Sequence, residues 1–551
     1  MNLSRPGSLL RSGHVDTFCR DNLPPLSEWP ELLFELDELR YPERLNCVAE
    51  LLDNVVARLG ADRPCLLTPD GPAWTYGRLL DTVNRVANVL SQQLDVIPGN
   101  RVLIRGPNSP WLAACWLATL KAGAVAVTTM PLLRPGELTV ITEISRPRVV
   151  LCDARFIEGL QSADLHGART VTFGSDAQDD LCSLAATADD HFDAVDTAAD
   201  DVALLAFTSG TTGRPKATMH FHRDVLANAD TFAKQIVGIR ADDIVTGTPP
   251  LSFTFGLGGL LVFPLRVGAA TLLLERATPQ ALAEAIEAHS VSICFTAPTA
   301  YRAMLSGGTA GKLRTLRRAV SAGEHLPATT WHAFYEATGV KLIDGIGSTE
   351  MLHVFISAAD DDIRPGSTGR AVPGYRAAVL DEDGNPVPAG VPGRLAVKGP
   401  TGCRYLSDER QKTYVSRGWN ITGDVFFQDE DGYFHYQARA DDMIVSSGYN
   451  IAGPEVEEAL GSHPAVLECA VVGLPDIARG QLVKAFVVVK NGFTAGDDLV
   501  AELQHHVKQT IAPYKYPRAI QFVEELPHTS TGKLQRFAVR TLAAGSGTEP
   551  A

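Results

Sequence analysis

The chain has 551 residues, of which 45% are hydrophobic and 21% are charged, and its formal net charge at pH 7 is −15. A single domain usually holds about 50–250 residues, so we expect two or more hydrophobic cores. The acidic balance argues against a nucleic-acid-binding protein, which presents a basic face, and it means that an anionic substrate must be held by local donors.

Strands and helices alternate from residue 65 to about residue 345, after an irregular arm over residues 1–45. Apolar residues at helical spacing predict a helix over 76–94. This rhythm predicts parallel sheets with helices on their faces. The other expected elements are strands at 101–105, 124–128, 149–152, 202–207 and 269–274, and helices at 110–122, 223–235 and 280–289.

The pattern changes near residue 365, where short runs alternate with turn signals such as D-E-D-G-N-P at 381–386 and D-E-D-G at 429–432. These signals predict a small β-rich unit that closes the large domain. A last α/β segment follows. We therefore expect an N-terminal domain at residues 1–437 and a C-terminal domain at residues 438–551.

The cysteines and the apolar stretches indicate the cellular compartment of the protein. Nine cysteines are scattered without a C-x-x-C pair, which is typical of reduced, buried thiols. The start of the chain lacks the apolar core of a signal peptide. The stretches 111–127 and 257–274 are interrupted by charged residues or proline and fall short of the roughly 20 apolar residues of a membrane span. We expect a soluble, cytoplasmic monomer or homodimer with no membrane or nucleic-acid partner.

The stretch T-S-G-T-T-G-R-P-K at 208–216 has the composition of a polyphosphate-binding loop. Its glycines let backbone N–H groups approach an anion, its hydroxyls donate further hydrogen bonds, and its lysine supplies a charge. It lacks the Gly-Lys-Ser/Thr step of the G-x-x-x-x-G-K-[ST] loop, and on its own such a stretch is often a plain surface turn. The residues expected to bind phosphate are Thr208, Ser209, Gly210, Thr211, Thr212, Gly213 and Lys216.

Four later segments support this interpretation. D-G-I-G-S-T-E at 344–350 combines glycines that allow close backbone approach with a glutamate, a hard oxygen ligand for magnesium. G-W-N-I-T-G-D at 418–424 ends on an aspartate that can accept hydrogen bonds from ribose. The other two are R-A-D-D-M-I-V-S-S-G-Y-N-I-A-G-P-E-V-E at 439–457, and P-H-T-S-T-G-K-L-Q-R at 527–536, which places a lysine on a Gly/Thr turn.

Each of these residues also has a plain structural explanation. Glu350 alone fits a surface carboxylate, Gly-Asp at 423–424 a common turn, and Lys533 an ordinary surface lysine. Arg439 with the aspartates that follow fits a solvated ion-pair cluster, which contributes little to stability. The order and spacing of all five segments favours the functional explanation.

Together these segments resemble the adenylate-forming superfamily of acyl- and aryl-CoA synthetases, nonribosomal adenylation domains and firefly luciferase. The resemblance covers residues 50–540. The stretch D-G-I-G-S-T-E-M-L-H-V-F at 344–355 looks like the benzoate-CoA ligase branch, and residues 29–46 and 249–265 look like 2-aminobenzoate-CoA ligases. The resemblance implies an α/β fold: a large N-terminal domain of parallel αβαβα sheets with a small β-barrel-like subdomain, then a small, mobile α+β C-terminal domain.

The resemblance also implies a two-step reaction and a role for each matching residue. ATP and a carboxylate would give an acyl-adenylate and diphosphate, and the thiol of coenzyme A would then displace AMP. The phosphate loop would hold the β- and γ-phosphates, while Thr349 and Glu350 would contact the α-phosphate and Mg²⁺, with Thr212 as a further Mg²⁺ ligand. Adenine and ribose would be surrounded by Gly323, Glu324, Asp344, Gly345, Ile346, Asp424 and Arg439.

Three further roles come from the same likeness. Lys533 would bridge the substrate carboxylate and the α-phosphate and stabilise the charge that develops there. Asp441 stands at the interdomain hinge of the family, and Gly448 where the pantetheine arm passes. The chain departs from the family at Ile346, where an aromatic residue often precedes G-x-T-E, and at Ala438, where glycine is common.

The acyl pocket of the family would lie between residues 252–265 and 351–355. There Phe253, Phe255 and Phe355 can form a flat apolar slot, in which Gly256, Gly258 and Gly259 leave room for a ring. His353 is the one polar side chain that can address a ring substituent, and the backbone near Ser321 is a second candidate. The alternatives are a packed, neutral core histidine at 353 and a medium-chain fatty acid as the substrate.

We therefore predict an ATP-, Mg²⁺- and CoA-dependent aryl-CoA ligase, with 2-aminobenzoate as the single preferred acid and benzoate or hydroxybenzoate as alternatives. A stand-alone adenylation enzyme that loads a separate carrier protein is a second class. No fused carrier segment is expected, because the chain ends soon after Lys533. A non-catalytic homologue would be expected to lose Lys533 or Glu350.

Overall fold

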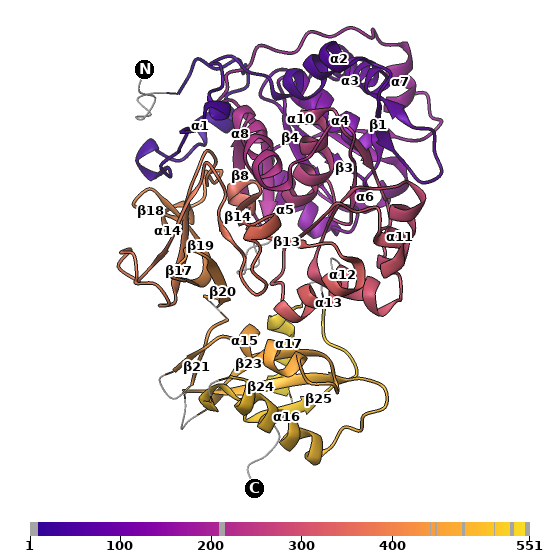
Figure 1. The fold of residues 1–551 in the computed structure, drawn as a ribbon. Helices are drawn as coiled ribbons and strands as arrows, with labels where there is room; N and C mark the ends of the chain where they lie inside the picture. The colour runs from indigo at the N-terminus through magenta and orange to yellow at the C-terminus, as the bar shows by residue number, and fades with distance from the viewer. Residues whose placement is uncertain are drawn as a thin grey trace.

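The computed structural model describes residues 9–208, 215–440, 442–446, 449–476, 480–511, 513–528 and 534–545. Figure 1 shows a large body with a smaller C-terminal unit below it. The large body holds three sheets and the small unit a fourth. This arrangement confirms the predicted fold class.

The first sheet has six strands in the order β6-β5-β3-β4-β7-β8, all parallel except β8, which runs antiparallel to β7. Every residue of β3 and β5 is buried, as expected for strands with helices on both faces. The strands are β3 (Arg101–Arg105), β4 (Val125–Thr129), β5 (Val149–Asp153), β6 (Arg169–Phe173), β7 (Val202–Thr208) and β8 (Lys216–Phe221).

The second sheet has nine strands in the order β15-β14-β13-β12-β11-β9-β10-β1-β2. Its middle is parallel and its outer strands are antiparallel, and β1 pairs with β10 about two hundred residues later, through Leu66 and Thr271. The strands are β1 (Pro64–Leu67), β2 (Trp74–Thr75), β9 (Ile244–Gly247), β10 (Ala270–Leu272), β11 (Ile293–Thr296), β12 (Arg318–Ala322), β13 (Leu342–Gly347), β14 (Val354–Ser357) and β15 (Arg370–Ala371).

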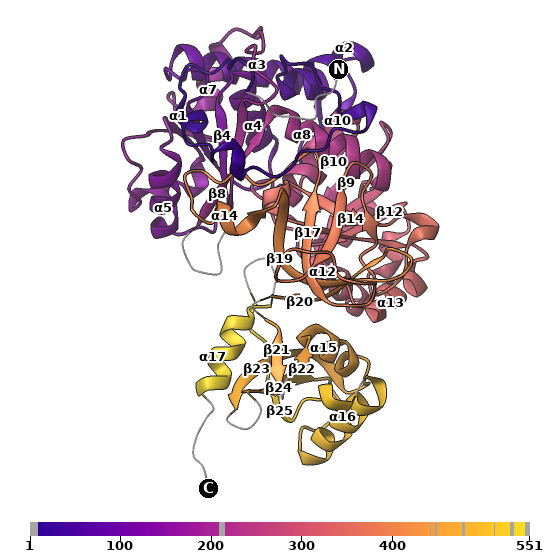
Figure 2. The ribbon, with the colours of Figure 1, turned by 90° about the vertical axis from the view of Figure 1, so that its left-hand side faces the viewer.

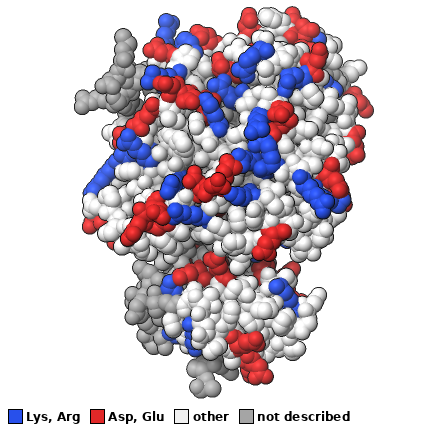
Figure 3. Space-filling model, in the orientation of Figure 1, with Lys and Arg blue, Asp and Glu red and all other residues white. Residues whose placement is uncertain are grey.

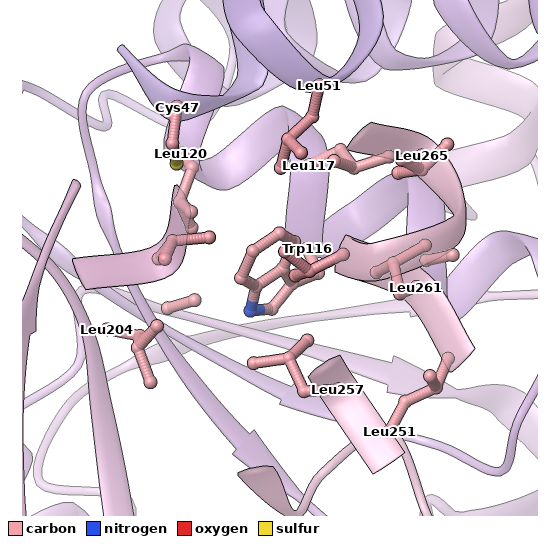
Figure 4. Packing of buried hydrophobic residues seen from close by; sticks show 14 of the residues in the cluster. Cys47, Leu51, Trp116, Leu117, Leu120, Leu204, Leu251, Leu257, Leu261 and Leu265 are labelled. Atoms are coloured by element: carbon pink, nitrogen blue, oxygen red, sulfur yellow. The ribbon is translucent and has the colours of Figure 1, made fainter. Parts of the chain in front are cut away.

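Helices cover both sheets, and α4 lies in the largest core. It begins at Pro110, whose missing N–H suits the first helical position, and the Ser109 hydroxyl accepts a hydrogen bond from the Leu112 N–H at 3.2 Å. Trp116 of α4 is 2% exposed, and Figure 4 shows it surrounded by leucines from several elements. The principal helices are α3 (Tyr76–Gln92), α4 (Pro110–Lys121), α5 (Pro135–Ser145), α7 (Leu181–Thr187), α8 (His222–Asn228), α11 (Pro279–Ala288), α12 (Pro298–Ser306) and α13 (Ala328–Thr338).

A small antiparallel sheet closes the large body. Its strands are β16 (Arg376–Leu380), β17 (Gly393–Lys398), β18 (Val415–Ser416), β19 (Trp419–Gln428) and β20 (Phe434–Arg439). The N-terminal arm runs along it, since the Leu33 N–H donates to the Gly399 carbonyl at 2.9 Å. Trp29 of the arm is 8% exposed and packs on Phe221 of β8 with ring centroids 5.7 Å apart.

The C-terminal unit is a five-stranded sheet with helices on both faces, which Figure 2 shows from the side. Alternate residues of β23 face opposite layers: Val472 joins the core under α17, and Val471 joins the core under α15 and α16. The elements are β21 (Ile444–Ser446), β22 (Tyr449–Ile451), α15 (Gly453–Gly461), β23 (Val466–Asp476), β24 (Gly480–Val489), α16 (Asp497–Thr510), β25 (Ala519–Phe522) and α17 (Arg536–Gly545).

The cysteines agree with the sequence expectation, since all nine are free thiols that are buried or partly buried. Acidic and basic side chains are interspersed over the face of the large body seen in Figure 3. Within the described ranges, no helix has both the length and the apolar character needed to cross a bilayer.

Candidate active site

The predicted Glu350 and Lys216 lie together under the end of β7. The Lys216 Nζ is 3.0 Å from a Glu350 carboxylate oxygen, which also accepts a hydrogen bond from the Tyr405 hydroxyl at 2.5 Å. Burial alone would raise the pKa of Glu350, but Lys216 and Tyr405 outweigh burial and hold that pKa below its ordinary value. The carboxylate is therefore ionised and available as a hard oxygen ligand.

The sequence did not point to the two tyrosines that complete this cluster. The Lys216 ammonium lies 4.3 Å from the ring centroid of Tyr405 and 5.3 Å from that of Tyr414. Tyr405 reaches the cluster because it forms a β-bridge with Thr218 of β8. No local pattern announces such a long-range pairing.

The donor set fits a magnesium ion that is shared with a nucleotide. The described residues include no group of three or more His, Cys, Asp or Glu side chains that could hold a metal alone. Mg²⁺ is usually bound through one or two carboxylates together with substrate phosphates, and Glu350 is such a carboxylate. Thr212, the other expected ligand, lies outside the described residues.

Several other predicted site residues also lie outside the described part of the chain, so their roles stay predictions. They are Ser209, Gly210, Thr211, Gly213, Asp441, Gly448 and Lys533.

The residues predicted to surround adenine end two neighbouring parallel strands. Ser321 of β12 is paired with Asp344 of β13, and Gly323 turns the chain with a φ of +88°, a value that favours glycine. The Ser321 Oγ, the Asp344 Oδ1 and the Glu324 Oε1 are buried without a hydrogen-bond partner among the described residues. Burial raises the pKa of Asp344 well above its ordinary value. Unpaired polar atoms at the carboxyl edge of a sheet are typical of a ligand site.

The predicted ribose pair is also brought together. Asp424 of β19 and Arg439 of β20 are cross-strand partners, with the guanidinium 3.1 Å from the carboxylate. Gly423 before the aspartate has a φ of +78°. The pair lies on the last two strands before the C-terminal unit.

A small, tightly packed apolar depression lies beside the 349–351 turn. Its walls differ from the predicted phenylalanine slot, because Phe355 is fully buried in the core and Phe253 is 40% exposed. The lining residues are Val225, Asn228, Thr254, Leu257, Gly258, Val262, Phe263, Leu352 and His353.

The sequence suggested that the glycines of this region leave an open slot. In the structure they do not. A Cβ on Gly258 would lie 2.5 Å from His353, and one on Gly259 would lie 2.9 Å from Phe295. A Cβ on Gly256 would lie 2.1 Å from the Pro250 carbonyl oxygen. These glycines instead let the chain pack closely behind the pocket.

His353 lines the pocket as a packed, neutral imidazole, which agrees with the alternative explanation of this residue. It is 3% exposed, and its ring lies 4.6 Å from Phe263 and 5.3 Å from Phe232. Burial lowers its pKa to about 3. Its Nε2 is 3.3 Å from the Phe255 carbonyl oxygen, which only accepts, so Nε2 carries the proton and Nδ1 is an acceptor. That Nδ1 has no partner among the described residues.

Acid is expected to destabilise the protein through its buried histidines. Burial lowers the pKa of His353 and His222 to about 3 and that of His325 to about 4. As the pH falls, these histidines take up protons near pH 6.5 in the unfolded chain but only at much lower pH in the folded chain. The free energy of unfolding therefore decreases below pH 6.5, by about 1.4 kcal/mol for each histidine and each pH unit. His353→Phe should therefore reduce the slope of unfolding free energy against pH by about one proton between about pH 4.5 and 6. Denaturant titrations measure this slope, and identical slopes in both proteins would contradict the expectation.

The comparisons with known proteins agree with this geometry. Residues 52–405 match the family described as AMP-binding enzyme, and residues 455–533 match its C-terminal domain. The chain belongs to this family of adenylate-forming enzymes.

Three relatives narrow the position within the family. Benzoate–CoA ligase of Thauera aromatica is 38% identical over 515 residues, which cover 91% of this chain and 97% of that protein. The crystal structure of the anthranilate CoA ligase AuaEII with anthranoyl-AMP has a TM-score of 0.86 and 35% identity, covering 93% of this chain and 100% of that one. A benzoate CoA ligase from Burkholderia xenovorans LB400 has a TM-score of 0.82 and 33% identity, covering 90% and 100%. The chain lies in the aryl-CoA ligase branch of the family.

Proposed function

We propose that this chain is an AMP-forming acid–thiol ligase that joins a small aromatic carboxylic acid to coenzyme A, with 2-aminobenzoate as the preferred acid. In the first step the carboxylate oxygen attacks the α-phosphorus of ATP, and diphosphate leaves. In the second step the thiol of coenzyme A attacks the carbonyl carbon, and AMP leaves. The named activities of the similar proteins support this reaction. The geometry of the site supports the roles of individual residues in it.

The residues near Glu350 would serve the first step. Lys216 and the phosphate loop would hold the β- and γ-phosphates, and Thr349 would donate to the α-phosphate. Glu350 would hold Mg²⁺, which when bound neutralises charge on the phosphates. Lys533 would stabilise the developing charge between the two reactants.

The remaining predictions of the sequence fit this scheme as proposals. Asp344 with Gly323 and Glu324 would surround adenine, and Asp424 with Arg439 would hold the ribose. The C-terminal domain would rotate about Asp441 so that Gly448 borders the pantetheine arm in the second step. The nine free thiols favour a reducing compartment such as the cytoplasm.

The observation that carries the choice of acid is the Nδ1 of His353, which has no hydrogen-bond partner in the part of the chain that the structure describes. A buried acceptor without a donor costs about 1–3 kcal/mol. The ortho-amino group of 2-aminobenzoate supplies an N–H donor, whereas benzoate supplies none. The side chains around His353 are mostly apolar, as the walls of a site for an aromatic ring are.

The test compares kcat/KM for 2-aminobenzoate, benzoate and 4-hydroxybenzoate, read by AMP release and thioester mass. We expect 2-aminobenzoate to exceed benzoate by about 5- to 150-fold, which corresponds to one satisfied acceptor. His353→Phe should remove this preference while ATP and coenzyme A are still used. A clear preference of the native enzyme for benzoate or 4-hydroxybenzoate would overturn the choice of acid.

Ser321→Ala is the matched control, because the chain near Ser321 is the second predicted partner of the amino group and the Ser321 Oγ is buried without a hydrogen-bond partner among the described residues. The ortho-amino preference should survive in this variant. A preference that disappears in Ser321→Ala and persists in His353→Phe would assign the amino group to the serine instead.

A further inference from the structure

Strand β8 carries two side chains that reach the same turn. Lys216 and His220 are four residues apart, so they lie on one face of the strand. Lys216 pairs with Glu350, and the His220 Nε2 lies 2.8 Å from the carbonyl oxygen of Thr349. One strand face therefore contacts both residues of the turn that the proposed function places at the α-phosphate and Mg²⁺.

This turn has a strained backbone. Leu352, which follows it, has a φ of +69° and a ψ of −33°, a conformation that side-chain-bearing residues seldom adopt. Its N–H donates to the Thr349 carbonyl oxygen at 3.1 Å, the same oxygen that His220 contacts. Strained conformations persist where the surroundings over-determine them, and the hydrogen bond from His220 is one such restraint.

His220 is itself held in place. It is fully buried, and its Nδ1 lies 3.8 Å from the Asp224 carboxylate, too far for a hydrogen bond, with no hydrogen-bond partner among the described residues. Asp224 is paired with the buried Arg404, whose guanidinium lies 4.0 Å from the ring centroid of Phe221. Since a carbonyl oxygen only accepts, the proton of the bond to Thr349 sits on Nε2. The one hydrogen bond of the ring that the structure shows is therefore the one that Nε2 donates to the turn.

We infer that His220 is a positioning residue for adenylation: it holds the Thr349 carbonyl and thereby fixes the Thr349 hydroxyl and the Glu350 carboxylate toward the α-phosphate and Mg²⁺. The inference rests on the proposed function of that turn. In this proposal His220 acts through the turn rather than on the substrate or the metal, and no pattern in the sequence had singled it out.

The test uses two amides that differ only in reach. Glutamine places its Nε2 near the position of the His220 Nε2, whereas asparagine reaches only the position of Nδ1. In His220→Asn we expect ATP–diphosphate exchange to fall about 10- to 100-fold, the range of a small misplacement of a reacting group. His220→Gln should recover to within about threefold of the native rate, and thioester formation from supplied aryl-adenylate should be near normal in both variants.

A binding measurement separates positioning from general damage. Calorimetry with α,β-methylene-ATP and Mg²⁺ should show weaker binding in His220→Asn and recovery in His220→Gln. His222→Asn is the matched control, because His222 is equally buried two residues away but contacts Cys47 rather than the turn. It should keep native nucleotide binding whatever it does to the melting temperature.

The failures are distinguishable. Native exchange and nucleotide binding in His220→Asn, or equal loss in His220→Asn and His220→Gln, would overturn the role of His220. Glu350→Gln tests the proposed function separately: native exchange in that variant would overturn the placement of Mg²⁺ and the α-phosphate at the turn. Loss in Glu350→Gln with native behaviour in His220→Asn would overturn the role of His220 alone.

Discussion

Replacing Arg404 with methionine is expected to destabilise the N-terminal domain by about 3–5 kcal/mol, the usual effect of removing one partner of a buried ion pair. The side chains of Arg404 and Asp224 are both fully buried. Burial alone would raise the pKa of Asp224, and Arg404 is the first of the partners that keep it below its ordinary value. Without the arginine, the carboxylate must stay charged in an apolar core or take up a proton. Guanidinium unfolding at pH 7 measures the loss.

The double variant Arg404→Met/Asp224→Asn is the control, because it removes both charges. A buried ion pair contributes little relative to apolar replacements, so the double variant should recover much of the stability that the single variant loses. A single variant as stable as the native protein would contradict the expectation. A double variant no more stable than the single one would show that the loss comes from packing against Phe221 and Trp29.

Replacing Lys533 with alanine is expected to remove most of the first half-reaction. A positioned charge that meets developing negative charge contributes about 3–4 kcal/mol, so adenylate formation should fall by about 10²- to 10³-fold. The second half-reaction does not use that charge in the proposed scheme, so supplied aryl-adenylate should be converted to thioester at a nearly native rate.

Diphosphate exchange and thioester formation measure the two steps separately. Glu350→Gln offers a comparison, since it should also impair the first step but through the phosphates rather than through the carboxylate. Equal losses of both half-reactions in Lys533→Ala would refute the divided role of this lysine.

The elements of the fold could largely be predicted from apolar runs. The strand predicted at 101–105 is β3, and the helix predicted at 76–94 is α3, with its end two residues earlier. The order of the sheets could not be predicted, because pairing between β1 and β10 depends on contacts between distant segments. Apolar periodicity indicates which residues are buried, but it does not indicate which other segment they pack against.

The candidate site also has features that could be predicted from the sequence and features that could not. Segments that resemble a known family pointed to Lys216, Glu350, Asp424 and Arg439 one by one. The structure places Lys216 beside Glu350 and Asp424 beside Arg439. The phenylalanine slot was not found, since whether Phe355 lines a pocket or a core depends on the helices behind it. The roles of Tyr405 and His220 could not be predicted from the sequence, because their partners lie more than fifty residues away in the chain.

The pairing of β1 with β10 has a consequence for how the chain is made. The whole six-stranded sheet lies between these strands in the sequence, so it can form while β1 still has an open edge. At a synthesis rate of about 5–20 residues per second, roughly 10–40 s separate the two strands on the ribosome. During that interval Leu66, which is 1% exposed in the folded protein, can pair with Trp74 of β2 but not yet with Thr271 of β10. One edge of β1 can pair with β2 as soon as both have left the ribosome, while the other edge stays open until β10 emerges and is a segment of the nascent chain that a chaperone can shield.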